Sequence, residues 1–426
     1  MLIETLEALF LVLAALTVVY MTRHFIFTLT ALKSPGTRSE ADDEKSSYRP
    51  TVSVLIPACD EGHVIGRVLR RMTELTYPKE KLQVIVIDDA SRDDTGKTGD
   101  QFSKRYPFIE VVHRTWKEGR KGKAAALNAV LQYVKGEIVF CFDADYYPQR
   151  SILEKLVRHF TNPSVGAVQG RVIVLNEPKN LVTRLVSLER IGGYRVDQQA
   201  RDSLGLIPQF GGTVGGVRRC LLEHLGGWDG SILAEDTDLT FRIYLAGYRI
   251  RYDNDAECYE EAVENWRAYW RQRYRWSRGH MQCAFKHAPK VLTSRHLTLK
   301  QKIDGLLLLN IYFMPVLTLL SWIVCIPLFF LGPSQGFVIL WAAVSVSVYS
   351  FVGNFAPFFE VGVGAYLDGR KRAHWLVSLL IFTFIYNIPI CTKAFVDLLI
   401  SKALRTREVV WHKTTHFGDG NSYIMN

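Results

Sequence analysis

The chain has 426 residues, of which 48% are hydrophobic and 22% are charged, and its formal net charge is +10. This length corresponds to about two domains, or to one domain with a membrane region. The positive charge fits a protein that faces a membrane or handles phosphates, whereas the lack of a basic recognition helix or an RNA-binding signature argues against a nucleic-acid partner.

The cysteines argue against two further classes of protein. None of the seven forms a CxxC pair or a Cys/His zinc spacing, which disfavours a disulfide framework and a structural zinc site. The pattern fits a reducing cytosolic compartment for the middle of the chain. They stand singly at positions 59, 141, 220, 258, 283, 325 and 391.

Residues 1–32 predict a transmembrane segment, because their apolar run is long enough to cross about 30 Å of hydrocarbon. Arg23 and His24 interrupt this run, and its acidic beginning fits a signal peptide poorly. Lys33 and Arg38 follow it, so the positive-inside rule places the next part of the chain in the cytoplasm. Residues 33–50 are predicted to be a polar linker.

Residues 51–290 predict one α/β domain with a mostly parallel, Rossmann-like sheet. Short β-branched runs such as "TVSVLIP", "LQVIVIDDA" and "EIVFCFDAD" alternate with amphipathic segments such as "HVIGRVLRRM" and "KAAALNAVLQYV". Ligands bind beyond the carboxyl ends of the strands in such sheets. The acidic residues that follow these strands are therefore candidates for a site.

Residues 291–400 predict an interfacial helix and transmembrane segments, followed by a tail at 401–426. Three apolar runs, at 305–332, 336–359 and 375–400, are each long enough to span. Two spans would return the basic "DGRKR" to the cytoplasm, as expected, but a third would leave Lys402, Arg405 and Arg407 outside, against the positive-inside rule. A re-entrant or interfacial last segment, with Pro389 near its middle, is the alternative.

The acidic ends of two predicted strands are candidates for binding a nucleotide and a metal. Asp143 and Asp145 follow one strand, and their i, i+2 spacing predicts that both project on the same side. Paired carboxylates suit Mg²⁺ or Mn²⁺, and a solvated acidic turn is the alternative. Asp89 ends another strand, where it could bind a base or ribose or instead cap a turn.

Three further motifs are also candidates for the site. Lys121 and Lys123 flank the start of a predicted helix, which is either a phosphate site or a basic cap. Glu235, Asp236 and Asp238 begin another helix, where they could supply a general base or only complement the helix dipole. In "RQRYRWSRGH", three residues share one helix face and could hold a diphosphate and a flat ring, or instead anchor the membrane interface: Gln272, Arg275 and Trp276.

The order of "IPACDE", "DDAS", "GKAAALN", "DAD", "AED" and "QRYRW" resembles the membrane-embedded branch of glycosyltransferase family 2, which includes cellulose, chitin, hyaluronan and poly-N-acetylglucosamine synthases. The resemblance covers roughly residues 51–287 and implies a GT-A-type catalytic domain. "GGT" stands where the family often has Cys-Gly or Ser-Gly, and Ala234 replaces the usual Thr before Glu-Asp.

The resemblance implies a role for each motif residue. Asp89 would hold the nucleoside in a pocket lined by residues from Pro57 to Glu61, with Lys123 near the nucleotide. Asp143 and Asp145 would contact UDP and its metal. Asp236 would be the catalytic base, and Gln272, Arg275 and Trp276 would clamp the diphosphate and position the acceptor.

Three functions remain open at this point. The first is a processive, inverting synthase that adds hexose from a UDP-sugar to a β-linked polysaccharide and threads it through its own spans, which carry polar residues. The second transfers one or a few sugars to a membrane lipid. The third is a catalytically silent receptor or scaffold, which the intact set of motifs disfavours. The predicted location is the cell membrane, with several spans, a cytoplasmic catalytic domain and an accessory export or regulatory subunit as a possible partner.

Overall fold

The structure is a computed structural model that describes residues 1–33, 47–332, 336–338, 356–370 and 373–404. The α/β domain is built on one eight-stranded sheet, in which the strands lie in the order β3-β2-β1-β4-β7-β6-β8-β5. Strands β3, β2, β1 and β4 are parallel neighbours, β7 is antiparallel to both β4 and β6, and β6 is parallel to β8. The strands are β1 (Val52–Ala58), β2 (Leu82–Asp88), β3 (Ile109–His113), β4 (Ile138–Cys141), β5 (Tyr147–Pro148), β6 (Val165–Val174), β7 (Gly215–Arg218) and β8 (Arg249–Glu260).

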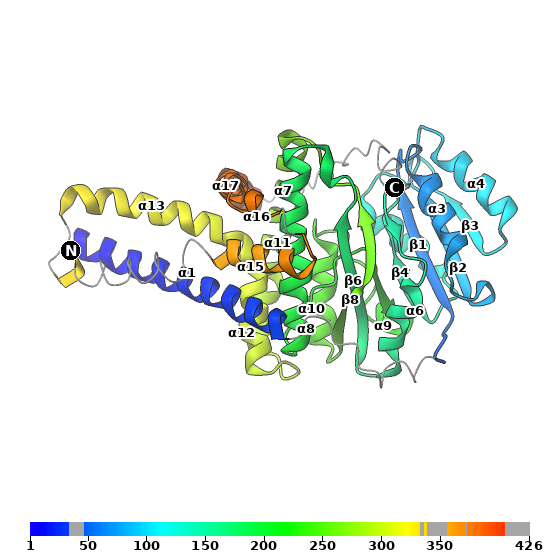
Figure 1. The fold of residues 1–426 in the computed structure, drawn as a ribbon, viewed down its shortest axis with the longest axis horizontal. Helices are drawn as coiled ribbons and strands as arrows, with labels where there is room; N and C mark the ends of the chain where they lie inside the picture. Colours follow the sequence, from blue (N-terminus) through cyan, green and yellow to red (C-terminus); the bar gives the residue numbers. More distant parts are fainter. Residues whose placement is uncertain (34–46, 333–335, 339–355, 371–372, 405–426) are drawn as a thin grey trace.

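The strands form because their apolar residues are buried on both faces of the sheet, as in parallel α/β folds. In β2, Val84 and Val86 join one core while Ile85 and Ile87 join the other. Helices cover both faces (Figure 1). One layer contains α3 (Ile65–Glu74), α4 (Thr95–Arg105) and α6 (Ile152–Val157), and the other contains α5 (Lys123–Ala129), α9 (Arg219–His224), α10 (Glu235–Leu245) and α11 (Trp266–Thr293). The predicted alternation of strands and helices is confirmed.

A helical unit lies between the sheet and the apolar helices at the two ends of the chain. It runs from α7 (Leu181–Arg190) through the π-helix η5 (Ile191–Gln198) to α8 (Gln199–Ser203). Helix α1 (Leu2–Lys33) ends against this unit, where Arg23 forms an ion pair with Asp197 at 3.1 Å. Arg201 of α8 pairs with Asp304 of α12 (Leu299–Leu309) at 2.6 Å. Both polar residues that interrupt the first apolar run therefore have partners, because His24 also pairs with Glu360 at 2.5 Å; Glu360 is buried and Asp197 is partly buried.

Three described helices are long and apolar enough to cross a membrane: Leu2–Lys33, Ile311–Leu331 and Trp375–Ala403. Helices α1 and α13 (Met314–Leu331) project together from one end of the domain (Figure 1). They are antiparallel, since Leu13 near the beginning of α1 packs with Val324 and Leu328, while the Tyr20 hydroxyl donates to the Leu307 carbonyl.

The run at 305–332 is not one continuous helix. Helix α12 (Leu299–Leu309) ends at Asn310, and the short η6 (Ile311–Phe313) separates it from α13. Leu308 and Leu309 belong to the core beneath the sheet, which explains their apolar character without a membrane. Most of the run at 336–359, including Asn354, lies outside the described residues.

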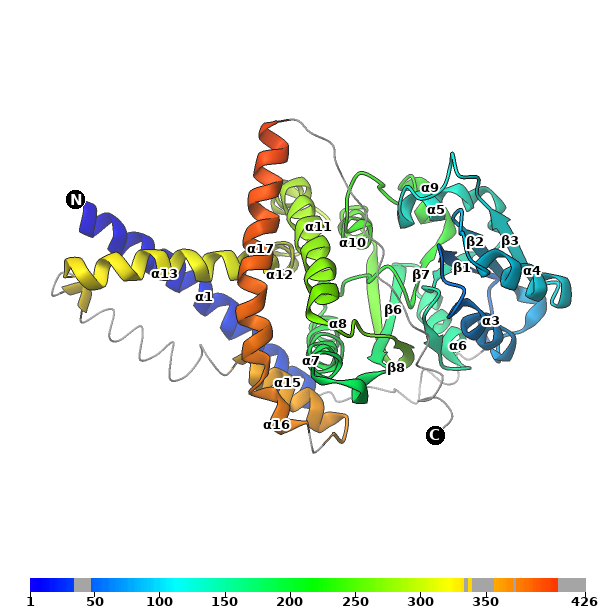
Figure 2. The same cartoon turned by 90° about the horizontal axis from the view of Figure 1, so that it is seen from above.

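The chain after this gap is packed against the domain. Helix α15 (Ala356–Leu367) contacts α1 and η5, and the turn that follows it carries Asp368, which pairs with Arg171 of β6 and with Arg195 of η5. The short α16 (His374–Val377) leads into α17 (Leu380–Ala403), which lies beside α11 (Figure 2).

Candidate active site

Backbone strain gathers at the carboxyl ends of the parallel strands. Among the described residues, four that are not glycine have positive φ: Asp60 (55°), Ala90 (58°), Arg120 (58°) and Val214 (54°). Asp60 and Ala90 follow β1 and β2, Arg120 contacts both of them, and the amide of Val214 donates to the carbonyl of Cys141 at the end of β4. Strained conformations of this kind cluster at functional sites, so this edge is the candidate site.

Asp89 lies at this edge with its carboxylate engaged by the protein. Oδ1 accepts from Arg114 Nη1 at 2.5 Å and Oδ2 accepts from the Arg120 amide at 2.9 Å. Burial raises the pKa of Asp89, against the lowering by Arg114 and Arg120. Pro57 lies at the end of β1, and the Glu61 amide donates to Thr95 Oγ1 at 2.8 Å, so both line the same end of the sheet as Asp89.

Strand β4 ends at Cys141, so Asp143 and Asp145 follow the strand as predicted, but they lie in the turn beyond it, where strand alternation does not set the direction of their side chains. Asp143 is partly exposed and accepts from Lys123 Nζ at 2.5 Å, whereas Asp145 is buried. Burial alone would lower the pKa of Lys123, but the carboxylates of Asp143 and Glu235 raise it. Lys123, the first residue of α5, thus holds the motif through its charge.

The oxygen atoms of this turn fit a divalent cation that a ligand completes. No group of three or more His, Cys, Asp or Glu side chains in the described part of the chain could hold a metal on its own. Mg²⁺ is commonly bound by one or two carboxylates together with substrate phosphates. The hard oxygen donors of Asp143 and Asp145 suit that arrangement.

The three acids of α10 have three different environments. Asp238 is fully buried and accepts from His287 Nε2 at 2.7 Å, Lys286 Nζ at 2.6 Å and Arg242 Nε at 2.6 Å. Burial alone would raise the pKa of Asp238, but these three donors outweigh burial and hold the pKa well below its usual range. The carboxylate is therefore ionised and acts as a structural anchor. Glu235 lies near Lys123, and Asp236 is the acid of the three that faces the strained loop before β7.

That loop, Gly211 to Val214, lies against Asp236 and is held in place by hydrogen bonds to Gln169. Gln169 is fully buried in β6; its Oε1 accepts from the Gly211 amide at 2.7 Å and its Nε2 donates to the Thr213 carbonyl at 3.0 Å. A Cβ at Gly212, whose φ is +72°, would lie 3.0 Å from the Cβ of Asp236. Glycine therefore leaves room beside the carboxylate.

The Asp236 carboxylate is held by its neighbour in the chain. Oδ1 accepts from the Thr237 amide at 2.6 Å, and the Thr237 hydroxyl lies 3.1 Å from His280 Nε2 and accepts from Gln209 Nε2 at 2.8 Å. Burial lowers the pKa of His280 to about 4, so its imidazole is neutral near pH 7. Thr237 thus supplies a hydroxyl close to the Asp236 carboxylate, where Ala234 cannot.

Helix α11 brings the QxxRW motif to the same place through one close contact. A Cβ at Gly279 would lie 2.6 Å from the Ala234 nitrogen, so glycine allows the start of α10 to touch α11. Arg275 is near enough to Glu235 to oppose the rise in its pKa. The structure therefore brings Arg275, Lys123, Asp143 and Asp236 to one edge of the sheet.

Trp276 is flanked by two guanidinium groups, those of Arg190 at 4.9 Å and Arg273 at 4.6 Å from its ring centre. Arg190 is held by Glu260 at 2.6 Å, and the Tyr146 hydroxyl donates to Glu260 at 2.5 Å. Stacked cations of this kind fix the plane of an aromatic ring. The indole is thus oriented by β8, α7 and the turn after Asp145.

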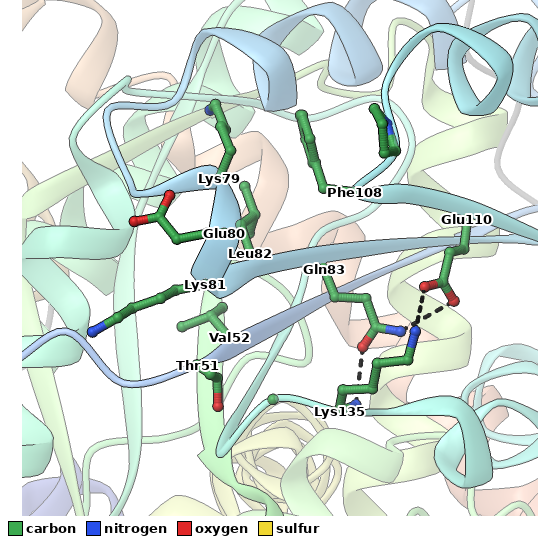
Figure 3. A pocket seen from close by; sticks show the side chains of 12 residues that line it. Thr51, Val52, Lys79, Glu80, Lys81, Leu82, Gln83, Phe108, Glu110 and Lys135 are labelled. Atoms are coloured by element: carbon green, nitrogen blue, oxygen red, sulfur yellow. Dashed lines mark hydrogen bonds and ion pairs between the residues drawn. The ribbon is translucent and has the colours of Figure 1, made fainter.

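A separate hollow lies at the opposite edge of the sheet (Figure 3). It is lined by the amino ends of β1 and β2, where Gln83 and Lys135 contact Glu110 at 3.1 and 2.8 Å. Ligands of parallel α/β sheets bind at the other edge. The hollow therefore plays no part in the site.

Sequence reasoning missed the residues that support the site from other elements: Arg114, Arg120, Gln169, Arg190, Thr237, Glu260 and His280. A polar Gln169 within the buried run "VGAVQGRVIV" was the available signal, because a buried amide needs partners. The two arginines after β3 carry no comparable pattern.

The family model described as "Glycosyltransferase like family 2" matches residues 50–279, more than half of the chain. The chain belongs to glycosyltransferase family 2. Its mostly parallel sheet with helices on both faces is the GT-A-type fold predicted from the sequence. The processive polysaccharide branch named by the resemblance is a finer assignment than the family match supports.

The relatives of this glycosyltransferase include membrane-lipid enzymes. It is 34% identical over 393 residues, 89% of this chain and 90% of the relative, to a probable glycosyltransferase, YdaM, of Bacillus subtilis. It is 30% identical over 387 residues, 88% of this chain and 79% of the relative, to the beta-monoglucosyldiacylglycerol synthase of Trichormus variabilis. The mannosyltransferase PcManGT of Pyrobaculum calidifontis, solved with GDP-Man and Mn²⁺, superposes with a TM-score of 0.58 and 25% identity, covering 87% of this chain and 99% of that one.

One prediction concerns the pH dependence of this glycosyltransferase. Burial, then the neighbouring Asp236, raises the pKa of Glu235 to about 7, while Lys123 and Arg275 oppose the rise. Above that pH, Glu235 becomes an additional negative charge beside Lys123 and Arg275, and it offsets part of their positive charge. We expect kcat/KM for the sugar nucleotide to fall as the pH rises through about 7, and Glu235→Gln to remove that step, because kcat/KM reports groups of the free enzyme. An unchanged profile in the variant would assign the step to another group.

Proposed function

We propose that this glycosyltransferase transfers a single hexose, glucose being the first donor to test, from a UDP-sugar to the hydroxyl of a diacylglycerol-type membrane lipid. The observation that carries the proposal is the 30% identity to a beta-monoglucosyldiacylglycerol synthase over 88% of this chain. The site also lies close to the apolar helices. His280, which contacts Thr237 beside the proposed base, packs with tilted rings against Tyr312, just before α13, with ring centres 4.7 Å apart.

The proposed mechanism is one inverting displacement. Asp236 accepts the proton of the lipid hydroxyl, whose oxygen attacks the anomeric carbon from the face opposite UDP. The bond from that carbon to the diphosphate oxygen breaks, UDP leaves with the electron pair, and an α-linked donor gives a β-linked product. Gly212 leaves space for the acceptor beside Asp236, and Trp276 presents its ring to the acceptor or sugar.

The leaving diphosphate is met by positive charge. Arg275 and Lys123 lie at the edge where it would be released, and fixed charges of this kind stabilise a transition state because they need no reorganisation. A divalent cation, Mg²⁺ or Mn²⁺, held by Asp143 and Asp145 would neutralise further diphosphate charge. Asp89, with Pro57 and Glu61, would border the nucleoside, while Gln272 would contribute its amide to the same clamp.

The processive polysaccharide synthase is the second candidate, favoured by the complete set of motifs. Its other argument, polar residues in the spans, is weakened by their contacts. The Asn387 amide donates to the Tyr269 hydroxyl at 3.1 Å, Tyr386 packs on Trp266, and the Asn310 amide donates within its own helix. Asn387 and Tyr386 thus join α17 to α11, the ordinary role of polar residues in membrane proteins, and Asn310 is satisfied locally.

The test is a transfer assay with purified protein in mixed micelles containing diacylglycerol, over a panel of UDP-sugars with Mg²⁺ or Mn²⁺. We expect one donor to give UDP release and one organic-soluble product that carries a single sugar, and chelation by EDTA to abolish both. A water-soluble or gel-retained polymer would favour the second candidate instead. UDP release that continues at the full rate in EDTA would contradict the metal assignment.

A further inference from the structure

The last apolar helix, α17, is long enough to cross a membrane, but a crossing at this point leaves Lys402, Arg405 and Arg407 on the wrong side by the positive-inside rule. We propose that α17 instead lies in the plane of the membrane interface, with one apolar face on α11 and the other on lipid. The C-terminal tail then leaves α17 on the side of the catalytic domain.

The beginning of this segment is tied to the catalytic side. Asp368, in the turn after α15, pairs with Arg171 of β6 and with Arg195. In the same turn, Arg370 contacts Glu177 and lies 3.2 Å from the Ser187 hydroxyl. The chain is therefore docked on the domain shortly before α16 and α17 begin.

The rest of α17 follows α11 along its length. Tyr386 packs on Trp270 with ring centres 5.4 Å apart, Ser277 Oγ lies 3.3 Å from Cys391 Sγ, and the Tyr274 hydroxyl donates to Asp397 at 2.6 Å. At the far end, Lys402 Nζ lies 3.5 Å from the ring centre of Phe285. Both ends of α17 therefore contact the helix that carries the QxxRW motif, so α17 begins and ends on one side.

The two views give the direction of α17 relative to the projecting pair. In Figure 1, α1 and α13 run lengthwise while α17 is seen nearly end-on; in Figure 2, α17 runs across them. If α1 and α13 cross the bilayer, α17 lies parallel to its surface. Helix α17 lies at the end of α1 and α13 that adjoins the α/β domain, where the membrane interface would be.

The apolar residues of α17 fall into two stripes, which an in-plane position explains. The inward stripe is buried at helical spacing, as in Leu380, Thr383, Ile390, Ala394 and Leu398. The outward stripe is exposed at the same spacing, at Phe382, Ile385, Val396, Leu399 and Ile400. Water would oppose such an exposed stripe, whereas an interfacial helix buries its apolar face at the boundary of headgroups and acyl chains. The lipid leaflet that surrounds α1 and α13 is the occupant that this position provides.

The charges support the same arrangement. Lys393 pairs with Asp397 at the edge of the helix, and Lys402 lies at its end, where basic side chains reach lipid headgroups. If α17 does not cross the bilayer, no span separates the basic "DGRKR" from the stretch of sequence that carries Lys402, Arg405 and Arg407. The positive-inside rule is then satisfied.

The decisive experiment measures immersion depth in the full-length protein reconstituted in phosphatidylglycerol–phosphatidylcholine vesicles. Nitroxide labels are placed one at a time at Phe382→Cys, Pro389→Cys and Ile400→Cys, in a background in which Cys220 and Cys325 are replaced by Ser. Position 389 lies near the middle of the apolar helix, about 11 Å from position 382 and about 17 Å from position 400 along the axis. We expect equal depths at all three sites from oxygen and nickel-chelate accessibility, whereas a spanning helix would place position 389 near the bilayer centre, much deeper than the other two.

A matched control uses the spanning helix α1. Val12→Cys and Leu29→Cys are similarly exposed and about 25 Å apart along their axis, and we expect their depths to differ clearly. A second measurement fuses alkaline phosphatase or a fluorescent protein to Asn426 of the full chain. We expect inactive phosphatase and a fluorescent fusion. Active phosphatase, or a label at position 389 that lies much deeper than those at positions 382 and 400, would overturn the proposal, and neither result depends on the enzymatic reaction.

Discussion

Replacing Asp236 with Asn is expected to lower kcat by about 10²–10⁴-fold, the usual contribution of a general base. The amide keeps the size of the side chain and its bond from the Thr237 amide, which is 2.6 Å in length, but it cannot accept the proton of the acceptor. The melting temperature should stay within a few degrees of the native value, because Asp236 is only partly buried. UDP release and a thermal melt measure the two effects.

Asp238→Asn is the matched control, because the same substitution two residues along the helix touches no reacting atom. It leaves Lys286, Arg242 and His287 around a buried neutral group, and breaking a buried ion pair costs about 3–5 kcal/mol. We expect a lower melting temperature and a nearly normal kcat per folded molecule. If Asp238→Asn abolished turnover in folded protein while Asp236→Asn did not, the assignment of the base would be reversed.

The second large effect is expected from Gly279→Ala. The added methyl group would lie 2.6 Å from the Ala234 nitrogen and 2.7 Å from its Cβ, so either α10 or α11 must shift. Since Asp236 is on α10 and Arg275 is on α11, the shift separates the base from the leaving-group clamp. A misplacement of about 1 Å can cost about 10²-fold in rate. The measurement is kcat, with circular dichroism to show that the variant is folded.

Gly362→Ala is the control for the change of residue type. Gly362 lies in α15, and a Cβ there would meet nothing within 4 Å. Alanine is favoured over glycine in a helix by up to about 1 kcal/mol, so this variant should be as active as the native protein and slightly more stable. Native turnover in folded Gly279→Ala would show that α10 and α11 can separate without harm.

The sequence was sufficient for the architecture of the sheet because the signals there are local and strong. Runs such as "LQVIVID" are buried on both faces, and their polar ends mark the carboxyl edge. The order of the strands and the antiparallel β7 were not predictable, since they depend on packing between elements far apart in the chain. A similar limit applies at Asp143 and Asp145: the apolar run "EIVFCF" continues past the last ladder residue, Cys141, so the alternation of the strand does not extend to them.

The site shows a similar division. The residues with chemical motifs, such as Asp143, Asp236 and Arg275, could be selected from spacing, and the structure brings them to one edge. The residues that orient them could not, because Gln169, Arg190 and Glu260 act through single long-range contacts. In the membrane region, hydropathy treats Leu309 and Leu320 alike, although one packs beneath the sheet and the other is exposed on α13.

The ion pairs at the end of α1 have a consequence for any attempt to work with a shortened protein. Arg23 is buried against Asp197, and Phe27 and Ala31 of the same helix pack on Val196 and Ala200. A protein that begins at residue 47 would lack Arg23, the ion-pair partner of Asp197, and the apolar side chains that cover the π-helix. A generic hydrophobic anchor would not restore these specific contacts. The first helix and the α/β domain should therefore be kept together when the protein is purified or when domains are exchanged between relatives.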